Sequence, residues 1–291
     1  MEGTLHAGLN VTEYILSLAD SAVINPPPDL SPLLTQLKRI GNNLNQIAAK
    51  VNSGAAYAPG LREVAALQRE LLDQLLRMTK EEYPNLPYFI YGHSMGSFLT
   101  RTLLYTYPDA GLTGAVISGT GWMPKPVLMA GRMVCKQQSG KHGWDGTSPT
   151  INKLMFGSYN KGFENPRTAV DWLSRDETVV DRYIADPLCG FDASVGLSYE
   201  MLGGMLANED AKNLDRMPKD LPVLFVSGDK DPVGGNGKGV RQTWAAFRKA
   251  GLQDVRLRLY ADGRHEMHNE RNRAELHADV LAFLDEILNK A

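Results

Sequence analysis

The stretch Tyr88-Phe89-Ile90-Tyr91-Gly92-His93-Ser94-Met95-Gly96-Ser97-Phe98 decides the fold of this 291-residue chain. Its first half is an apolar, aromatic-rich run, which is typical of a buried β-strand. After Gly96 the apolar residues recur at helical spacing over residues 98–104. The stretch therefore predicts a strand, a sharp turn with Ser94 at its apex, and a helix.

The glycines on either side of the serine, Gly92 and Gly96, have a steric reason in such a turn. The turn is strained, and we expect a Cβ at either position to collide with the neighbouring strand or helix. The helix start also places unpaired backbone N–H groups, including that of Met95, beside Ser94.

Length and composition limit the class of protein. The chain is long enough for one large α/β domain, or for one domain with an appendage. Its net charge of -2 gives no general attraction to nucleic acid or to an anionic membrane. No apolar run is long enough to span a bilayer, and the first residues lack the features of a signal peptide. The two cysteines, Cys135 and Cys189, favour a reducing, cytoplasmic location with both thiols unpaired and at least one of them buried.

Residues 1–78 differ from the rest in their pattern of apolar residues, and they predict an N-terminal helical region. Pro26-Pro27-Pro28 marks a stiff linker. Apolar residues then recur at spacings of three and four over residues 33–51, and again over residues 61–75. A stretch rich in Gly, Ala and Pro, residues 53–60, separates the two runs. They are interpreted as a helical hairpin, or as a pair of helices that packs on something else.

Part of this region resembles a known family. The segments Gly8-Leu9-Asn10-Val11-Thr12-Glu13-Tyr14-Ile15 and Leu37–Ala48 are similar to plasmid mobilisation accessory proteins (MobC-like). Members of that family assist a relaxase at a transfer origin and usually read DNA with a strand before the first helix, which we expect to be missing here. Residues 1–78 hold six Lys/Arg and seven Asp/Glu, so this region lacks the excess of positive charge that is typical of DNA-binding segments. We therefore expect packing, and not nucleic-acid binding, as the role of this region.

From about residue 79 the pattern alternates between strands and helices. Strands are predicted at 86–91, 112–118, 221–227 and 255–260. A helix that ends at about residue 107 follows the first strand, a helix at 240–250 follows the third, and a helix at 273–288 follows the fourth. This alternation favours a mostly parallel sheet with helices on both faces. The interval 122–218, with helical pieces near 169–173, 177–184 and 199–213, interrupts it. Its Met and aromatic content suits a cap over an apolar pocket.

Two further motifs follow the last two strands. Gly228-Asp229-Lys230-Asp231-Pro232-Val233 comes after the third strand, and Arg264-His265-Glu266 comes after the fourth. Serine hydrolysis needs a hydroxyl that attacks, an imidazole that takes its proton and a carboxylate that orients the imidazole. The carboxyl ends of parallel strands meet at one edge, so these motifs should lie near Ser94. Asp229 and Asp231 are the candidate acids, and His265 and His268 the candidate bases.

With Gly92-His93-Ser94-Met95-Gly96, these motifs make residues 79–291 resemble the monoacylglycerol lipase, lysophospholipase and serine aminopeptidase branch of the α/β-hydrolases. The resemblance implies a truncated α/β-hydrolase sheet, with a core at 79–121 and 219–291 and a cap at 122–218. It also implies Ser94 as nucleophile, Asp231 as acid, His265 as base and the Met95 N–H as an oxyanion donor. Asp229 is then expected to form a turn, His268 to lie at the surface and His93 to be structural.

Two other patterns suggest binding sites, and neither holds. His265-Glu266-x-His268 is one residue short of the zinc-binding H-E-x-x-H spacing, so neither a metal nor a cofactor is expected. Residues 234–239 are rich in glycine but lack the Ser/Thr of a phosphate-binding loop. They predict a turn that leads into a helix.

The sharp turn at Ser94 is called the elbow, and the strand that leads into it the elbow strand. The chain departs from the family before the elbow strand, where helical sequence replaces strands. The elbow strand should therefore lie at a sheet edge, covered by the N-terminal helices or paired with a second copy in a homodimer. The second oxyanion donor normally follows one of the missing strands and is not identified. The predicted function is hydrolysis of carboxylic esters (monoacylglycerol, lysophospholipid or short acyl esters). The expected rate of this hydrolysis is lowered by the incomplete oxyanion hole. The alternative is a catalytically impaired interaction protein linked to DNA mobilisation.

Overall fold

The computed structural model describes residues 76–290, which belong to the second of two units of the chain, Tyr57–Ala291. Most of the predicted N-terminal helical region therefore lies outside the described residues. Four strands form one parallel sheet in the order β1-β2-β3-β4. Their bounds are β1 Phe89–His93, β2 Gly114–Ser118, β3 Val223–Gly228 and β4 Val255–Tyr260. Within residues 76–290, β1 pairs only with β2, so the elbow strand lies at the edge predicted for it.

The two central strands are buried along their whole length, as expected for parallel strands covered on both faces. Their side chains alternate between two hydrophobic clusters. Ile117 and Phe225 belong to one cluster, and Val116 and Val226 belong to the other. This period of two explains why the runs read as continuously apolar in the sequence.

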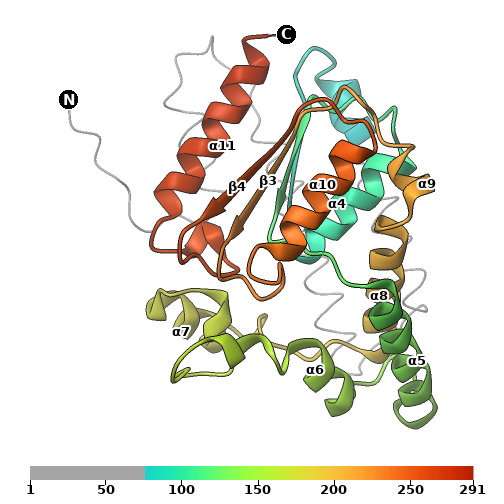
Figure 1. Cartoon of the computed structure of the whole chain (residues 1–291), viewed down its shortest axis with the longest axis vertical. Helices are drawn as coiled ribbons and strands as arrows, with labels where there is room; N and C mark the ends of the chain where they lie inside the picture. Colours follow the sequence, from blue (N-terminus) through green and yellow to red (C-terminus); the bar gives the residue numbers. More distant parts are fainter. Residues whose placement is uncertain (1–75, 291) are drawn as a thin grey trace. The chain divides into compact units, whose positions relative to one another are not determined.

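Helices cover both faces of the sheet (Figure 1). Helices α4 (Met95–Thr106) and α10 (Lys238–Lys249) pack on the face of Ile117 and Phe225. Helix α11 (Arg273–Leu288) packs on the opposite face. Aromatic contact supports the first layer, because the rings of Phe225 and Phe247 meet edge to face at 5.1 Å.

The chain between β2 and β3 forms a helical insertion with a cluster of its own. Buried side chains of this cluster include Leu128, Cys135 and Leu202, which pack with Phe98 of α4. The helices of the insertion are α5 Lys125–His142, α6 Pro149–Phe156, η1 Tyr159–Gly162, η2 Asp171–Leu173, α7 Glu177–Ala185, α8 Val195–Asn208 and α9 Ala211–Leu214.

Buried polar groups fasten the insertion to α4 at two points. Arg101 is 1% exposed, and it donates to the carbonyl of Gly121 at 3.0 Å and to that of Asn208 at 3.3 Å. The Asn208 side chain in turn donates to the Phe98 carbonyl at 3.0 Å. The helix that follows Ser94 therefore holds Gly121, near the start of the insertion, and Asn208, the last residue of α8.

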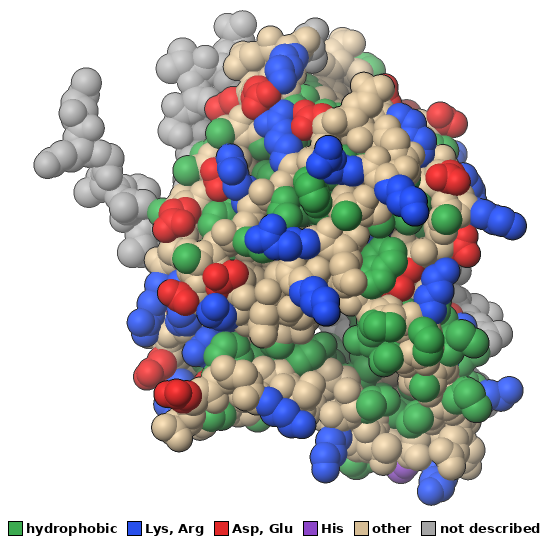
Figure 2. All heavy atoms as spheres, viewed as in Figure 1, with side chains coloured by type: hydrophobic (Ala, Val, Ile, Leu, Met, Phe, Trp, Pro, Cys, Tyr) green, Lys and Arg blue, Asp and Glu red, His purple; other side chains and the backbone are tan. Residues whose placement is uncertain are grey.

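Part of the insertion's surface is apolar. Val127, Met129 and Met133 of α5 are 53%, 60% and 74% exposed. Figure 2 shows hydrophobic side chains gathered over α5 and α8.

The predicted elements agree with the structure in type and differ mainly at their ends. The predicted strands at 86–91, 112–118 and 221–227 start two or three residues early, whereas β4 and α11 match in full. One predicted helix, 199–213, is wrong in extent: α8 starts at Val195, and Asp210 caps a separate helix, α9. Helices α5 and α6 were not predicted. Residues 234–239 form the expected turn, in which Gly237 has φ 83° and caps α10.

Three expectations from composition are tested by residues 76–290. Cys135 is buried and Cys189 is half-buried, and both thiols are free, as predicted. No helix in this range combines the length and apolarity needed to cross a bilayer.

A side chain was predicted to collide with neighbouring elements at both glycines of the turn between β1 and α4, and the structure confirms this at one of them. A Cβ built on Gly92 would lie 2.5 Å from the Gly96 carbonyl oxygen and even closer to the Thr100 hydroxyl. A Cβ built on Gly96 meets no described atom within 4 Å, so the expected collision at Gly96 is wrong. The difference arises because Gly92 lies against the backbone of the helix, whereas Gly96 is a helical residue whose Cβ position is open among residues 76–290.

These two glycines form a matched pair for mutation. We expect Gly92→Ala to lower the free energy of unfolding by about 1–3 kcal/mol, because the new methyl group overpacks the turn. We expect Gly96→Ala to change it by no more than about 0.5 kcal/mol. Urea denaturation of both variants checks this, and equal losses would contradict the steric reading of the turn.

Candidate active site

Ser94 lies at the apex of the turn in a backbone conformation that few side-chain-bearing residues adopt. It is the N-cap of α4, with φ 54° and ψ -121°. Its N–H donates to the Ser118 carbonyl at 3.0 Å, and its own carbonyl accepts from the N–H of Ser97 at 2.9 Å. A non-glycine residue at positive φ costs about 1–3 kcal/mol and persists where its surroundings enforce it. Here a strand and a helix enforce it.

The fold brings Ser94, His265 and Asp231 together as a chain of hydrogen bonds. His265 Nε2 lies 2.8 Å from Ser94 Oγ, and His265 Nδ1 lies 3.1 Å from Asp231 Oδ2. Asp231 is fully buried and accepts a 2.9 Å hydrogen bond from the N–H of Val233 and a 3.3 Å hydrogen bond from Ser227 Oγ. With Nδ1 donating to Asp231, Nε2 of a neutral His265 can accept the hydroxyl proton of Ser94.

The environment of His265 shifts its affinity for protons. Burial alone lowers the pKa of His265, since its side chain is 2% exposed. The charge of Asp231 and its hydrogen bond, followed by the charge of Glu266, outweigh burial and raise the pKa of His265 above its ordinary value. A base of this kind holds a proton more firmly than a free imidazole does, which suits an imidazolium that must form during acyl transfer.

The insertion touches the candidate base directly. The Trp172 ring lies 5.1 Å from the His265 ring, centroid to centroid. The N–H of His265 donates to the Trp172 carbonyl at 3.4 Å, and the N–H of Glu266 donates to that of Leu173 at 2.7 Å. Trp172 belongs to the Met-rich and aromatic interval of the sequence, but nothing in the sequence assigns it this position.

A second histidine and carboxylate pair lies beside the first. His93 Nε2 is 3.3 Å from Glu266 Oε1, and His93 Nδ1 is 3.0 Å from Ser118 Oγ. The rings of His93 and His265 are 4.8 Å apart. Burial raises the pKa of Glu266, but its hydrogen bond to His93, the charges of both histidines and a hydrogen bond from Asn269 lower that pKa to about 2. Glu266 is therefore a permanent negative charge next to His265.

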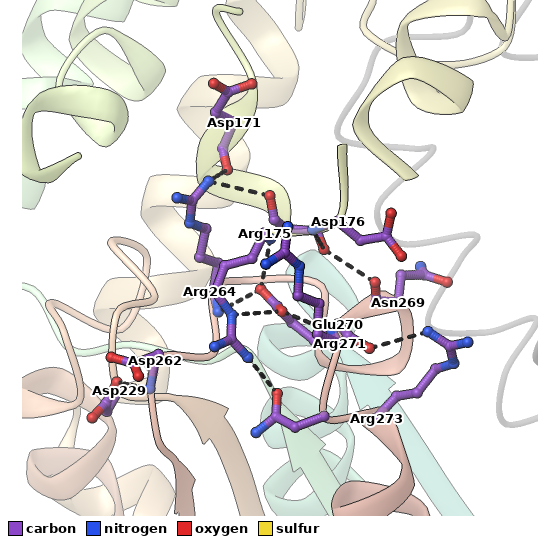
Figure 3. A network of polar contacts seen from close by, with 12 residues as sticks. Asp171, Arg175, Asp176, Asp229, Asp262, Arg264, Asn269, Glu270, Arg271 and Arg273 are labelled. Atoms are coloured by element: carbon purple, nitrogen blue, oxygen red, sulfur yellow. Dashed lines mark hydrogen bonds and ion pairs between the residues drawn. The ribbon is translucent and has the colours of Figure 1, made fainter. Parts of the chain in front are cut away.

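The loop that carries His265 is fixed to the insertion through Glu270, which is fully buried (Figure 3). Glu270 Oε1 accepts from the N–H groups of Arg175 at 2.9 Å and of Arg264 at 3.0 Å. Glu270 Oε2 accepts from Arg175 Nε at 2.9 Å and from the N–H of Arg271 at 3.0 Å. Arg264 adds contacts to the carbonyls of Asp171 and Ser174. The four donors to Glu270 hold the residue next to His265 in place.

The alternative candidates for acid and base lie elsewhere. Asp229 accepts from the N–H of Asp262 at 2.8 Å and so joins the loops after β3 and β4, as expected of a turn residue. His268 was expected to lie at the surface, and the structure places it half-buried. Its Nε2 is buried without a hydrogen-bond partner among the described residues, and its ring stacks on that of His277. Burial, followed by the charge of His277, lowers the pKa of His268 to about 4.

Comparison with known proteins gives the family. The profile described as serine aminopeptidase, S33, matches residues 54–272. The chain belongs to the serine aminopeptidase S33 family. A second profile, described as mobilization protein NikA, matches residues 5–51, in agreement with the resemblance noted for the N-terminal region.

Relatives of this S33-family chain include lipases and esterases. It is 27% identical over 217 residues to a monoacylglycerol lipase of Mycolicibacterium smegmatis, covering 72% of this chain and 66% of that protein. It is 24% identical over 204 residues to a monoglyceride lipase of Rattus norvegicus, covering 69% of this chain and 58% of that protein. The chain thus spans about two thirds or less of the length of these curated relatives.

Solved structures confirm the α/β-hydrolase fold of the S33-family chain. A thermostable carboxyl esterase from Bacillus coagulans aligns with a TM-score of 0.69 and 29% identity, over 75% of this chain and 71% of that one. A lipase in an open form aligns with a TM-score of 0.68 and 24% identity, over 77% and 73% of the two chains.

The Glu270 network predicts a large effect of a small change. We expect Glu270→Gln to lower the free energy of unfolding by roughly 3 kcal/mol, because an amide N–H₂ would replace an oxygen that accepts two N–H groups. The matched control is Glu177→Gln, because the Glu177 carboxylate is 73% exposed and its Oε2 lies as far as 4.0 Å from Arg167 Nε. We expect that control to stay within about 1 kcal/mol. Urea denaturation measures both, and a Glu270→Gln loss no larger than the control's would contradict this role.

Proposed function

We propose that this chain is a serine hydrolase that cleaves carboxylic esters through an acyl-enzyme. The observation that carries the proposal is the hydrogen-bonded chain from Ser94 through His265 to Asp231, with spacings of 2.8 and 3.1 Å. Each of these residues follows the carboxyl end of a strand of one parallel sheet, which is where α/β folds bind ligands. Membership of the S33 family and the lipase and esterase relatives support the same chemistry.

The geometry supports the following steps. Ser94 Oγ attacks the carbonyl carbon of the ester while its proton passes to His265 Nε2. Asp231 keeps Nδ1–H directed at its carboxylate and stabilises the imidazolium. The tetrahedral intermediate collapses when His265 returns the proton to the leaving alkoxide, which departs as an alcohol and leaves Ser94 acylated. Water, activated by His265, then releases the acid and restores Ser94.

One oxyanion donor is assigned in this proposal. The N–H of Met95 follows Ser94 at the start of α4, where backbone N–H groups have no acceptor within the helix. In the family the second donor normally follows a strand that precedes this one, and no residue of 76–290 is assigned to that role. An enzyme with a single donor turns over about 10²–10³-fold more slowly than one with two. We therefore expect weak turnover unless another segment or a second copy supplies the donor.

The favoured substrates are monoacylglycerols, lysophospholipids or short acyl esters. The names of the relatives, monoacylglycerol lipase and monoglyceride lipase, support this class. The insertion, proposed as a cap spanning 122–218 between core segments 79–121 and 219–291, adds apolar surface that suits acyl chains. Trp172 is its point of contact with His265. Among the strands of residues 76–290, β1 lies at the edge of the sheet, and this supports the further proposal of a homodimer joined at that strand.

A second candidate function rests on the match of residues 5–51 to the mobilization protein NikA. Under it, the chain is an interaction protein linked to DNA mobilisation, and its hydrolase part is catalytically impaired. Gel-shift titration with duplex DNA at several salt concentrations separates the two. Binding that weakens steeply with salt, together with absence of serine reactivity, would favour this second function.

Serine reactivity is the direct test of the first proposal. We expect a fluorophosphonate probe to label the full-length wild-type chain and to leave Ser94→Ala unlabelled, because only a hydroxyl paired with a base attacks the probe. Turnover of p-nitrophenyl butyrate should fall at least about 10³-fold in Ser94→Ala and in His265→Ala. Equal turnover by wild type and Ser94→Ala would rule out catalysis by this triad.

A further inference from the structure

Three side chains beside the proposed nucleophile form a cluster that the reaction does not need in full. His93, His265 and Glu266 each direct a potential ligand atom into one region, and these atoms lie within 4.8 Å of one another. His93 ends β1, whereas His265 and Glu266 lie in the loop after β4. Only the parallel pairing of the strands brings them together, so the spacing of residues along the chain does not reveal this cluster.

Two of the three ligand atoms already have the separation that a tetrahedral metal site requires. His93 Nε2 and Glu266 Oε1 are 3.3 Å apart. In a tetrahedral zinc site the bonds are about 2.0–2.2 Å long, which places neighbouring ligand atoms about 3.3–3.6 Å apart. A cation bound to both atoms would lie off the line that joins them, at the apex of a triangle with two sides of about 2.0–2.2 Å. The nitrogen of His265 must approach them to complete the site.

Outer hydrogen bonds orient both of these ligands. His93 Nδ1 lies 3.0 Å from Ser118 Oγ, and Glu266 Oε2 accepts from Asn269 Nδ2 at 3.1 Å. When Nδ1 of His93 carries its proton and donates to Ser118, the lone pair of Nε2 faces the Glu266 carboxylate. A cation between them satisfies both groups, as partners of this kind do in metal sites. His93 and Glu266 are 24% and 27% exposed, so an ion can enter from solvent.

We propose that a divalent cation of the zinc class binds His93, Glu266 and His265 and thereby blocks Ser94. The inhibitory part of this proposal rests on the proposed serine hydrolase function. His265 Nδ1 stays with Asp231, and the lone pair of Nε2 forms the bond to the metal. The hydrogen bond from Ser94 Oγ to Nε2 breaks, Ser94 keeps its proton, and nothing is oxidised or reduced. A metal-bound Nε2 can no longer act as a base.

The ligand set selects the class of cation. Two imidazoles and one carboxylate, with water as a fourth ligand, suit Zn²⁺, Cu²⁺ or Ni²⁺. Mg²⁺ and Ca²⁺ prefer sites built from oxygen atoms, so they are not expected to bind here. The site is therefore an inhibitory one and supplies no cofactor to the reaction.

Binding is tested first, without any need for activity. Isothermal titration of the full chain with ZnCl₂, and the visible absorption of bound Co²⁺, report occupancy directly. We expect wild type to bind the metal at this cluster, and His93→Asn and Glu266→Gln each to weaken binding at least about 10-fold. Asparagine can keep the Ser118 contact of His93 while losing Nε2. His142→Asn, an exposed histidine at the end of α5, is the matched control and should bind as wild type does.

Inhibition is tested next by labelling Ser94 with a fluorophosphonate probe. We expect ZnCl₂ to suppress labelling of wild type and of His142→Asn, EDTA to restore it, and MgCl₂ to have no effect. His93→Asn and Glu266→Gln should lose sensitivity to zinc when each is compared with its own rate without metal. Should one of the two fail to fold, the other gives the same comparison.

The outcomes of the two tests are separable. Absence of zinc binding to wild type, or binding that is unchanged in both ligand variants, would overturn the site. Binding at the site with undiminished labelling would overturn its inhibitory role. A wild-type chain that is unlabelled even without zinc would refute the serine hydrolase and with it the inhibition, while the titration still decides the metal site.

Discussion

The parallel alignment of four strands is the constraint on which the candidate site depends. Because β1, β3 and β4 run in the same direction, the loops that leave His93, Gly228 and Tyr260 emerge at one edge of the sheet. These loops also lie in close contact: a side chain at Gly228 would collide with the carbonyl groups of Gly263 and Arg264. Ser94, Asp231 and His265 are distant in sequence and meet only because of this alignment.

Alignment of the strands is not sufficient, because the loop that carries His265 has almost no apolar anchor of its own beyond Met267. Its position is set by buried polar groups, chiefly Glu270 with four N–H donors and Asp231 with donors from Val233, Ser227 and His265. A buried carboxylate is stable only when it is fully hydrogen-bonded. The same bonds that satisfy these charges therefore fix the base relative to the nucleophile, and they tie that arrangement to the insertion through Arg175.

The sequence was sufficient to predict the sheet, because apolar runs bounded by turn residues mark strands whatever their tertiary surroundings. The order of motifs after successive strands predicted that Ser94 would meet a carboxylate and a histidine at one edge, and the resemblance to the α/β-hydrolases selected Asp231 and His265 from the candidates. The sequence failed at α5 and at the break between α8 and α9, where the apolar periodicity is weak and a capping aspartate decides the boundary. It also failed at Gly96, because local sequence does not reveal which positions are covered by another element.

The energetic cost of the site bears on whether it is catalytic. Ser94 at φ 54° carries strain of about 1–3 kcal/mol, which glycine at that position would relieve. Buried Asp231 and His265 also cost desolvation energy, which a well-packed apolar pair would avoid. A chain used only for interaction would gain stability by losing both features. Their combination at one point, with Ser94 Oγ directed at His265 Nε2, is accounted for by reaction chemistry, so the structure favours hydrolysis over an interaction role. Only one oxyanion donor, the Met95 N–H, is assigned within residues 76–290, and the rate depends on a second, but this does not remove the reason for the arrangement.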